Sequence, residues 1–169
     1  APEVNTEFGG AIIPTMGAEV YLRHDLALQP IKAYVWQGTT GTSNEAHGKV
    51  VVQREYNDAK DFIVKKGETL VIDFGQNCAA VPSFTFQAKE GTTLTCLPAE
   101  LLNDGNVAHS RGMEGPEGSV HRRNLRIGDR SIRLDYTFGK SDTPVSYTPR
   151  NTFFGYRFVS ITATNEVVI

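Results

Sequence analysis

The stretch LVIDFGQNCAAVPSFTF, residues 70–86, decides the fold of this chain. It opens with the strand-like run Leu-Val-Ile and closes with Phe84 and Phe86, which alternate with polar residues. Such alternation predicts a strand with one face on a core and the other in water. Between the two strand signals lies DFGQN, residues 73–77, in which polar side chains and Gly75 interrupt the apolar pattern.

The DFGQN segment is open to a functional and to a structural interpretation. Asp-Phe-Gly also occurs in protein kinases, but the chain lacks their glycine-rich loop, lysine-bearing strand and His-Arg-Asp stretch. We therefore expect a bend at the end of a strand. Asp73, Gln76 and Asn77 should hydrogen-bond to neighbouring backbone there, while Gly75 relieves the bend or bulge.

Short runs rich in β-branched and aromatic residues recur along the chain and predict further strands. They cover residues 18–26, 31–38, 49–56, 61–75, 83–97, 133–139 and 156–165. In the second run, Ile31, Ala33 and Val35 should share one face of a strand. Tyr34 and Trp36 should point to the opposite face.

Turn sequences that contain glycine separate these runs at residues 38–41, 65–68, 89–92 and 103–106. The best helix candidate is LPAELLNDG, residues 97–105, which would form at most two turns. Many short strands with polar turns and little helix predict an all-β fold, an antiparallel β-sandwich or jelly roll.

The composition limits the classes of function. The chain has 169 residues, a net charge of -2 and a pI of about 6.1, which predicts a single domain, residues 1–169, and no nucleic-acid partner. No apolar run approaches the roughly 20 residues that span a bilayer, so we expect no membrane partner. The N-terminal residues show no signal-peptide pattern, and no motif for a cofactor is present.

The two cysteines, Cys78 and Cys96, lie in strand-like segments that are neighbours in the sequence. If these strands pair, a disulfide would stabilise the domain by about 3 kcal/mol. The favoured interpretation is two free buried thiols that pack as small apolar side chains.

The chemistry-bearing residues gather in the long loop of residues 106–123. Loops of this length are often functional, and an exposed tryptophan can act as a platform for a sugar. The candidate contacts to carbohydrate or to another domain are Trp36, His109, Arg111, Glu114, His121 and Arg122. A packing role for Trp36 and a solvated charged loop are the alternatives.

Catalysis and metal binding are not supported by the spacing of these residues. Glycoside hydrolysis needs two carboxyl groups at a defined separation, and nothing fixes such a pair among Glu100, Asp104, Glu114 and Glu117. His109 and His121 do not have a recognised metal-ligand spacing. We therefore predict no catalytic residue and no metal ligand.

A series of motifs resembles a known family. The segments IDFGQNCAAVPSF, EGTTLTCLPAELLNDG, NLR, DYTFG and YTPRNTFFGYRFVSIT occur in the order found in the concanavalin-like β-sandwich domain of bacterial α-L-rhamnosidases, glycoside hydrolase family 78. The resemblance covers residues 68–163. Two departures are Ala80, where the family commonly has glycine, and the longer loop at 106–123.

The resemblance implies an accessory role in a larger enzyme. That parent enzyme would remove terminal α-L-rhamnose by an inverting acid/base mechanism, with its catalytic carboxylates in a following (α/α)6 barrel. This chain would pack against the barrel and contact rhamnose-containing glycans, in a periplasmic or extracellular protein. A stand-alone carbohydrate-binding module and an interaction sandwich between domains are the alternatives.

Overall fold

The computed structural model describes residues 9–11, 13–14, 16–19, 21–57, 61–108, 114–125, 132–140 and 143–169. After the 3₁₀ turn η1 (His24–Leu26), the strands are β1 (Lys32–Thr40), β2 (Lys49–Tyr56), β3 (Ile63–Val64), β4 (Thr69–Ala80), β5 (Phe84–Ala88), β6 (Thr93–Ala99), β7 (Leu101–Leu102), β8 (Val120–His121), β9 (Leu134–Thr137), β10 (Val145–Tyr147), β11 (Phe154–Ala163) and β12 (Val167–Val168). Within the described residues, η1 is the one helical element, and no helix there is long and apolar enough to cross a membrane.

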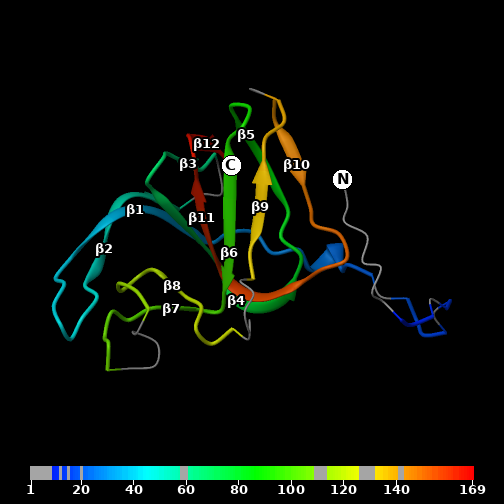
Figure 1. The fold of residues 1–169 in the computed structure, drawn as a ribbon, viewed down its shortest axis with the longest axis horizontal. Coiled ribbons are helices and arrows are strands. Elements are labelled where there is room, and N and C mark those ends of the chain that lie inside the picture. Colours follow the sequence, from blue (N-terminus) through cyan, green and yellow to red (C-terminus); the bar gives the residue numbers. More distant parts are fainter. Residues whose placement is uncertain are drawn as a thin grey trace.

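The strands form two main antiparallel sheets, as the sequence predicts (Figure 1). The larger sheet has the order β2-β1-β4-β11-β6-β9, and the smaller one has the order β10-β5-β12-β3. The pairings between these strands are all antiparallel. The fold is therefore a β-sandwich.

The main core lies between the two sheets. Inward-facing side chains alternate along each strand, as Leu70 and Ile72 do on β4 and Phe84 and Phe86 do on β5. Aromatic rings meet edge to face in this core, for example Phe86 with Phe138 at 5.1 Å between centroids. Each fully buried side chain of this size stabilises the fold by roughly 1.5–3 kcal/mol, so this layer holds the sandwich together.

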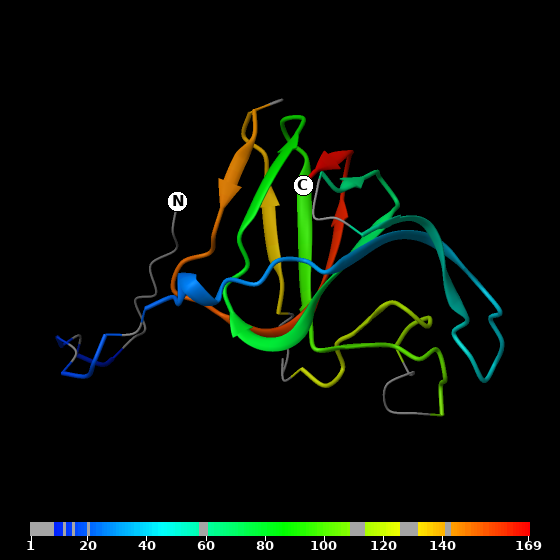
Figure 2. The same cartoon turned by 180° about the vertical axis from the view of Figure 1, so that it is seen from behind.

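A second, smaller apolar cluster covers the opposite face of the six-stranded sheet. Val71, Ala99 and Phe158 are buried there beneath the β7–β8 hairpin, which contributes Leu102 and Val120. The hairpin lies outside the two main layers (Figure 2). This third layer explains why alternate residues of β4 and β11 are apolar on both faces.

Strand β1 follows the predicted division between faces except at Ile31, which precedes the strand and is 60% exposed. Ala33 and Val35 are buried in the main core, whereas Tyr34 and Trp36 pack against the smaller cluster. The hydroxyl of Tyr34 donates a 2.5 Å hydrogen bond to the carbonyl of Gly118 in the loop above, and burial raises the pKa of Tyr34. The two faces of β1 therefore serve two different layers.

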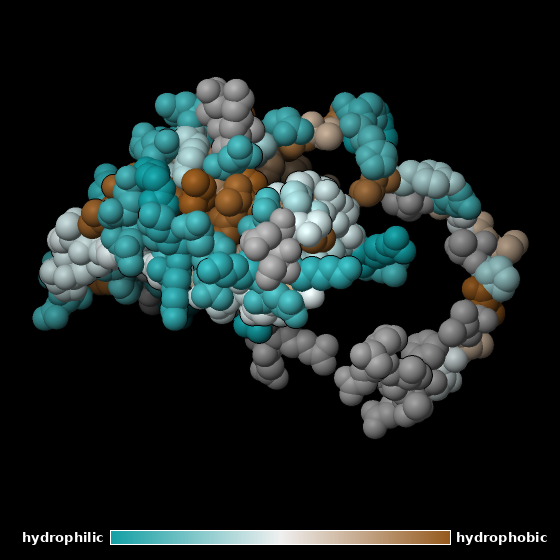
Figure 3. Space-filling view, turned by 90° about the horizontal axis from the view of Figure 1, so that it is seen from above, coloured by the Kyte–Doolittle hydropathy of each residue, from teal (hydrophilic) through white to brown (hydrophobic). Residues whose placement is uncertain are grey.

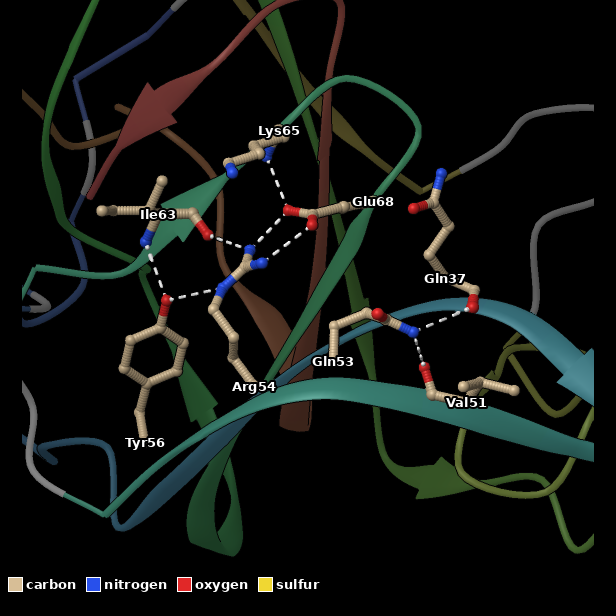
Figure 4. Close-up of polar contacts among 8 residues, drawn as sticks. All are labelled: Gln37, Val51, Gln53, Arg54, Tyr56, Ile63, Lys65 and Glu68. Atoms are coloured by element: carbon tan, nitrogen blue, oxygen red, sulfur yellow. Dashed lines mark hydrogen bonds and ion pairs between the residues drawn. The ribbon is translucent and has the colours of Figure 1, made fainter.

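An ion pair joins the edge of the larger sheet to the turn between β3 and β4 (Figure 4). Arg54 on β2 donates two hydrogen bonds to the Glu68 carboxylate and one to the carbonyl of Ile63. Glu68 also accepts from the backbone N–H of Lys65. The hydrogen bond from Arg54 is the main cause that holds the pKa of Glu68 below its usual value.

Two predicted elements are wrong. Residues 18–26 are not a strand: the described part has no regular structure before the 3₁₀ turn η1, and Tyr21 and Leu22 are exposed. Alternation alone forms no strand where no neighbouring strand offers its backbone. The helix expected at 97–105 is replaced by the end of β6 and by β7, because pairing of β6 with β11 outweighs the local helix preference.

The cysteines are free, as favoured from the sequence, but only Cys96 is buried and Cys78 is half-buried. Their strands do not pair with each other, because β11 lies between β4 and β6. The Cys78 thiol donates to the carbonyl of Tyr156 at 3.5 Å. Burial raises the pKa of Cys78, and it raises the pKa of Cys96 to about 12.

Candidate functional site

The DFGQN segment forms a large bulge within β4, which continues to Ala80, and does not end the strand as predicted. Between the pairs Asp73–Phe158 and Cys78–Tyr156, β4 has four intervening residues, whereas β11 has one. Gly75 has a φ of +82°, and a Cβ there would lie 3.0 Å from the side chain of Ile31. Glycine is required at this point both for its backbone conformation and for the close approach.

Asp73 fixes the base of the bulge. Its carboxylate accepts the backbone N–H of Gly75 at 2.7 Å and two hydrogen bonds from the Arg157 guanidinium at 2.8 and 2.9 Å. Burial opposes ionisation, but the hydrogen bonds from Arg157 outweigh it and hold the pKa of Asp73 below its usual value. The local role predicted for Asp73 is confirmed, and the ion pair to β11 adds to it.

The far end of the bulge reaches a different partner from the one predicted. The Asn77 side chain donates to Glu100 Oε1 at 3.2 Å and not to neighbouring backbone, because the bulge turns it toward the end of β6. Gln76 is exposed. The bulge therefore places an amide beside the Glu100 carboxylate.

Glu100 is held by two side-chain amides from distant parts of the chain. Its Oε1 accepts from Asn77, and its Oε2 accepts from Asn124 Nδ2 at 2.7 Å. These hydrogen bonds fix the orientation of the carboxylate, since each oxygen has a donor of its own. Each oxygen also keeps one lone pair for a further donor.

The Glu100 carboxylate lies in the wall of a cavity of about 290 Å³. The lining of this cavity includes Pro98, Glu100, Asn124, Leu125, Phe153 and Gly155. Phe153 is 70% exposed, whereas Phe154, which also lines the cavity, is half-buried and packs against the main core. A cavity of this size is at the small end of the range for small-molecule sites.

The sequence predicted a different set of residues, three of which the structure brings together. His121 is 2% exposed, and its Nδ1 lies 3.4 Å from Glu114 Oε1 and 3.0 Å from Asn103 Oδ1. The backbone N–H of Arg122 donates to the same Glu114 oxygen, and its guanidinium donates to the carbonyl of Ile132. These contacts hold the long loop against the β7–β8 hairpin.

Trp36 lies beneath this hairpin. It is half-buried against the smaller apolar cluster, and its Nε1 atom is buried. This position favours the packing interpretation over that of a platform. His109 and Arg111 lie outside the described residues.

The turn at 103–106 has the predicted structural role. Asp104 Oδ1 accepts the N–H of Asn106 at 3.1 Å, and Asn106 Oδ1 accepts the N–H of Ala108 at 2.9 Å. Gly105 supplies a φ of +77°. Within the described part of the chain, no group of three or more His, Cys, Asp or Glu side chains could hold a metal ion.

The two consecutive phenylalanines were only a weak signal for the cavity, because Phe153 precedes β11 and both residues line the cavity. Proximity of Glu100 to Asn77 and Asn124 could not be predicted, because it depends on the size of the bulge in β4.

The two packed antiparallel sheets define the class, a β-sandwich domain. The family model of the bacterial alpha-L-rhamnosidase concanavalin-like domain matches residues 63–168, and the chain belongs to this family. The range agrees with the resemblance seen from the motifs. No solved structure gives a significant match to the chain.

Two curated proteins are similar to the chain, and both are named Alpha-L-rhamnosidase. The protein from Alteromonas sp. (strain LOR) is 32% identical over 99 residues, which are 59% of this chain and 9% of that protein. The protein from Streptomyces avermitilis is 28% identical over 134 residues, which are 75% of this chain and 12% of that protein. The chain therefore spans only about a tenth of the length of these relatives.

Proposed function

We propose that this chain is a non-catalytic accessory domain of a larger α-L-rhamnosidase of glycoside hydrolase family 78. The observation on which the proposal rests is the family match combined with length: relatives named Alpha-L-rhamnosidase are roughly ten times longer than the matched segment. In this proposal the parent enzyme hydrolyses terminal α-L-rhamnose, and its catalytic residues lie in an (α/α)6 barrel outside this chain.

Exposed apolar side chains before β1 support a contact with that barrel. Met16, Tyr21, Leu22 and Leu26 are more than half exposed. They lie on the segment that leads away from the sheets, where brown apolar residues alternate with polar ones (Figure 3). A series of exposed apolar side chains often marks an interface, and we propose that the barrel covers it. Export of the parent enzyme to the periplasm or the medium stays a prediction.

Two measurements test this proposal. The purified 169-residue chain should not hydrolyse 4-nitrophenyl α-L-rhamnopyranoside, and it should bind the remainder of its parent enzyme in a calorimetric titration. The substitution Tyr21→Ala should weaken that binding by at least tenfold, because it removes a large exposed apolar contact. The control Val52→Ala, at an exposed position on β2, should leave it unchanged. Absence of binding to the remainder of the parent would contradict the accessory role.

A further inference from the structure

We propose that the cavity between Glu100 and Phe153 is a binding subsite for one pyranose residue with an apolar face, of the 6-deoxy kind. The choice of a deoxy sugar rests on the proposed function. The existence of the site rests on the geometry of the cavity itself, which the accessory role does not require.

Phe153 supplies the apolar side of this subsite. It is 70% exposed, and the half-buried Phe154, which also packs against the main core, lines the same cavity beside it. Exposing an aromatic ring is unfavourable in the free chain, and a rigid ring has little conformational entropy to lose on binding. The C–H groups on one face of a pyranose, together with a C6 methyl, are a suitable apolar partner for such a ring.

Glu100 supplies the polar side. The carboxylate is already oriented by Asn77 and Asn124, at 3.2 and 2.7 Å. Each carboxylate oxygen accepts one hydrogen bond from a described residue. Each oxygen therefore keeps one lone pair for a hydroxyl donor. Two vicinal hydroxyls of a sugar are donors of this kind, and hydrogen bonds to a charged acceptor are stronger than those between neutral groups.

Gly155 keeps the cavity open. It is an exposed residue of β11 opposite Ala79 on β4, and a Cβ at this position would lie 3.4 Å from Glu100 Oε1. Its φ is not in the left-handed region, so the backbone does not require glycine. The absence of a side chain instead leaves the carboxylate accessible.

A sugar fits this cavity better than a flat protein surface does. A protein surface that covered Glu100 would remove its water and leave the charge buried unless a donor entered the cavity. A pyranose brings its own donors, and a cavity of about 290 Å³ has room for one small ligand. Docking of a protein side chain is therefore the competing outcome of the test.

The test is a titration of the 169-residue chain with methyl α-L-rhamnopyranoside, followed by amide chemical shifts. We expect saturable shifts with a Kd on the order of millimolar, as for one small sugar with few contacts. Phe153→Ala and Gly155→Val should each weaken binding by at least tenfold, the first by removing the ring and the second by filling the cavity. Tyr21→Ala, which removes a similarly exposed aromatic ring elsewhere, should change the Kd by less than twofold.

The sugar itself provides a further control. Methyl α-L-mannopyranoside has the same ring configuration and adds one hydroxyl at C6, so it should bind more weakly than the rhamnoside. Unchanged unfolding midpoints would show that the variants keep their fold, as expected for an exposed phenylalanine and for a β-branched residue in a strand.

Three results would overturn the subsite: no saturable shift with the rhamnoside, equal binding by both cavity variants and the wild type, or shifts that map away from the cavity. If the rhamnoside does not bind and Phe153→Ala weakens association with the remainder of the parent, the cavity is a protein contact. The accessory role would then stand without the subsite. Sugar binding without any association with the parent would contradict the accessory role alone.

Discussion

The substitution Asp73→Ala tests the structural role of the DFGQN bulge. It removes two hydrogen bonds from Arg157 and one from the backbone N–H of Gly75. The Asp73 side chain is 15% exposed and that of Arg157 is 39% exposed, so water screens part of the ion pair. With about 1 kcal/mol for each of the three hydrogen bonds, the free energy of unfolding should fall by about 3 kcal/mol.

The assay is urea denaturation followed by tryptophan fluorescence, with thermal denaturation as a second measure. For a chain of this length, 3 kcal/mol corresponds to a decrease in Tm of about 6–12 °C. The control is Asp25→Ala, because Asp25 pairs with Arg23 on the surface, with both side chains more than 60% exposed. That substitution should leave the urea midpoint nearly unchanged, because an ion pair exposed to water contributes little to stability. Equal losses for the two variants would refute the role assigned to Asp73.

Further predictions concern the bulge, the thiols and acid stability. Gly75→Ala should lower the free energy of unfolding by about 1–2 kcal/mol in the same urea assay, because alanine is strained at a φ of +82°; an unchanged midpoint would contradict the bulge geometry. In native protein at pH 8, Ellman's reagent should modify Cys78 slowly and Cys96 only after unfolding, because Cys96 is buried; equal native rates would contradict this. The pKa values of Asp73 and Glu68 are lowered by folding, so their stabilisation should be complete above the unfolded pKa values of about 4 and lost as the pH falls through the lower folded pKa values. Urea midpoints between pH 7 and pH 3 measure it, and a stability that rises on acidification would contradict it.

The strands that the sequence predicted correctly are those in which residue type and face agree. In 31–38 the apolar residues alternate and 49–56 is rich in β-branched residues, and these runs form β1 and β2. The run at 18–26 shows similar alternation but pairs with no strand of the described residues, and sequence alone does not reveal a missing partner. At 97–105, Pro98 lies in β6 opposite Val159. Proline is tolerated there because β9 ends its pairing at Cys96, which leaves one edge of β6 without a described partner strand.

The candidate site was harder to predict than the fold. The sequence pointed to the long loop because its histidines and arginines are close together in the chain. Glu114, His121 and Arg122 do meet, but in contacts that hold the loop against its hairpin. The cavity residues Glu100 and Phe153 are 53 positions apart, and they share a wall because β6 pairs with β11 beside the bulge. Pairing of distant strands in this way has no local signature.

We propose that this chain is an accessory domain and performs no hydrolysis itself. The most direct measurement compares the purified 169-residue chain with its parent enzyme, at equal concentration, on 4-nitrophenyl α-L-rhamnopyranoside. We predict release of 4-nitrophenol by the parent and none above background by the chain. Turnover by the chain that is lost in Glu100→Gln would contradict the claim, since it would place a catalytic carboxylate in this domain.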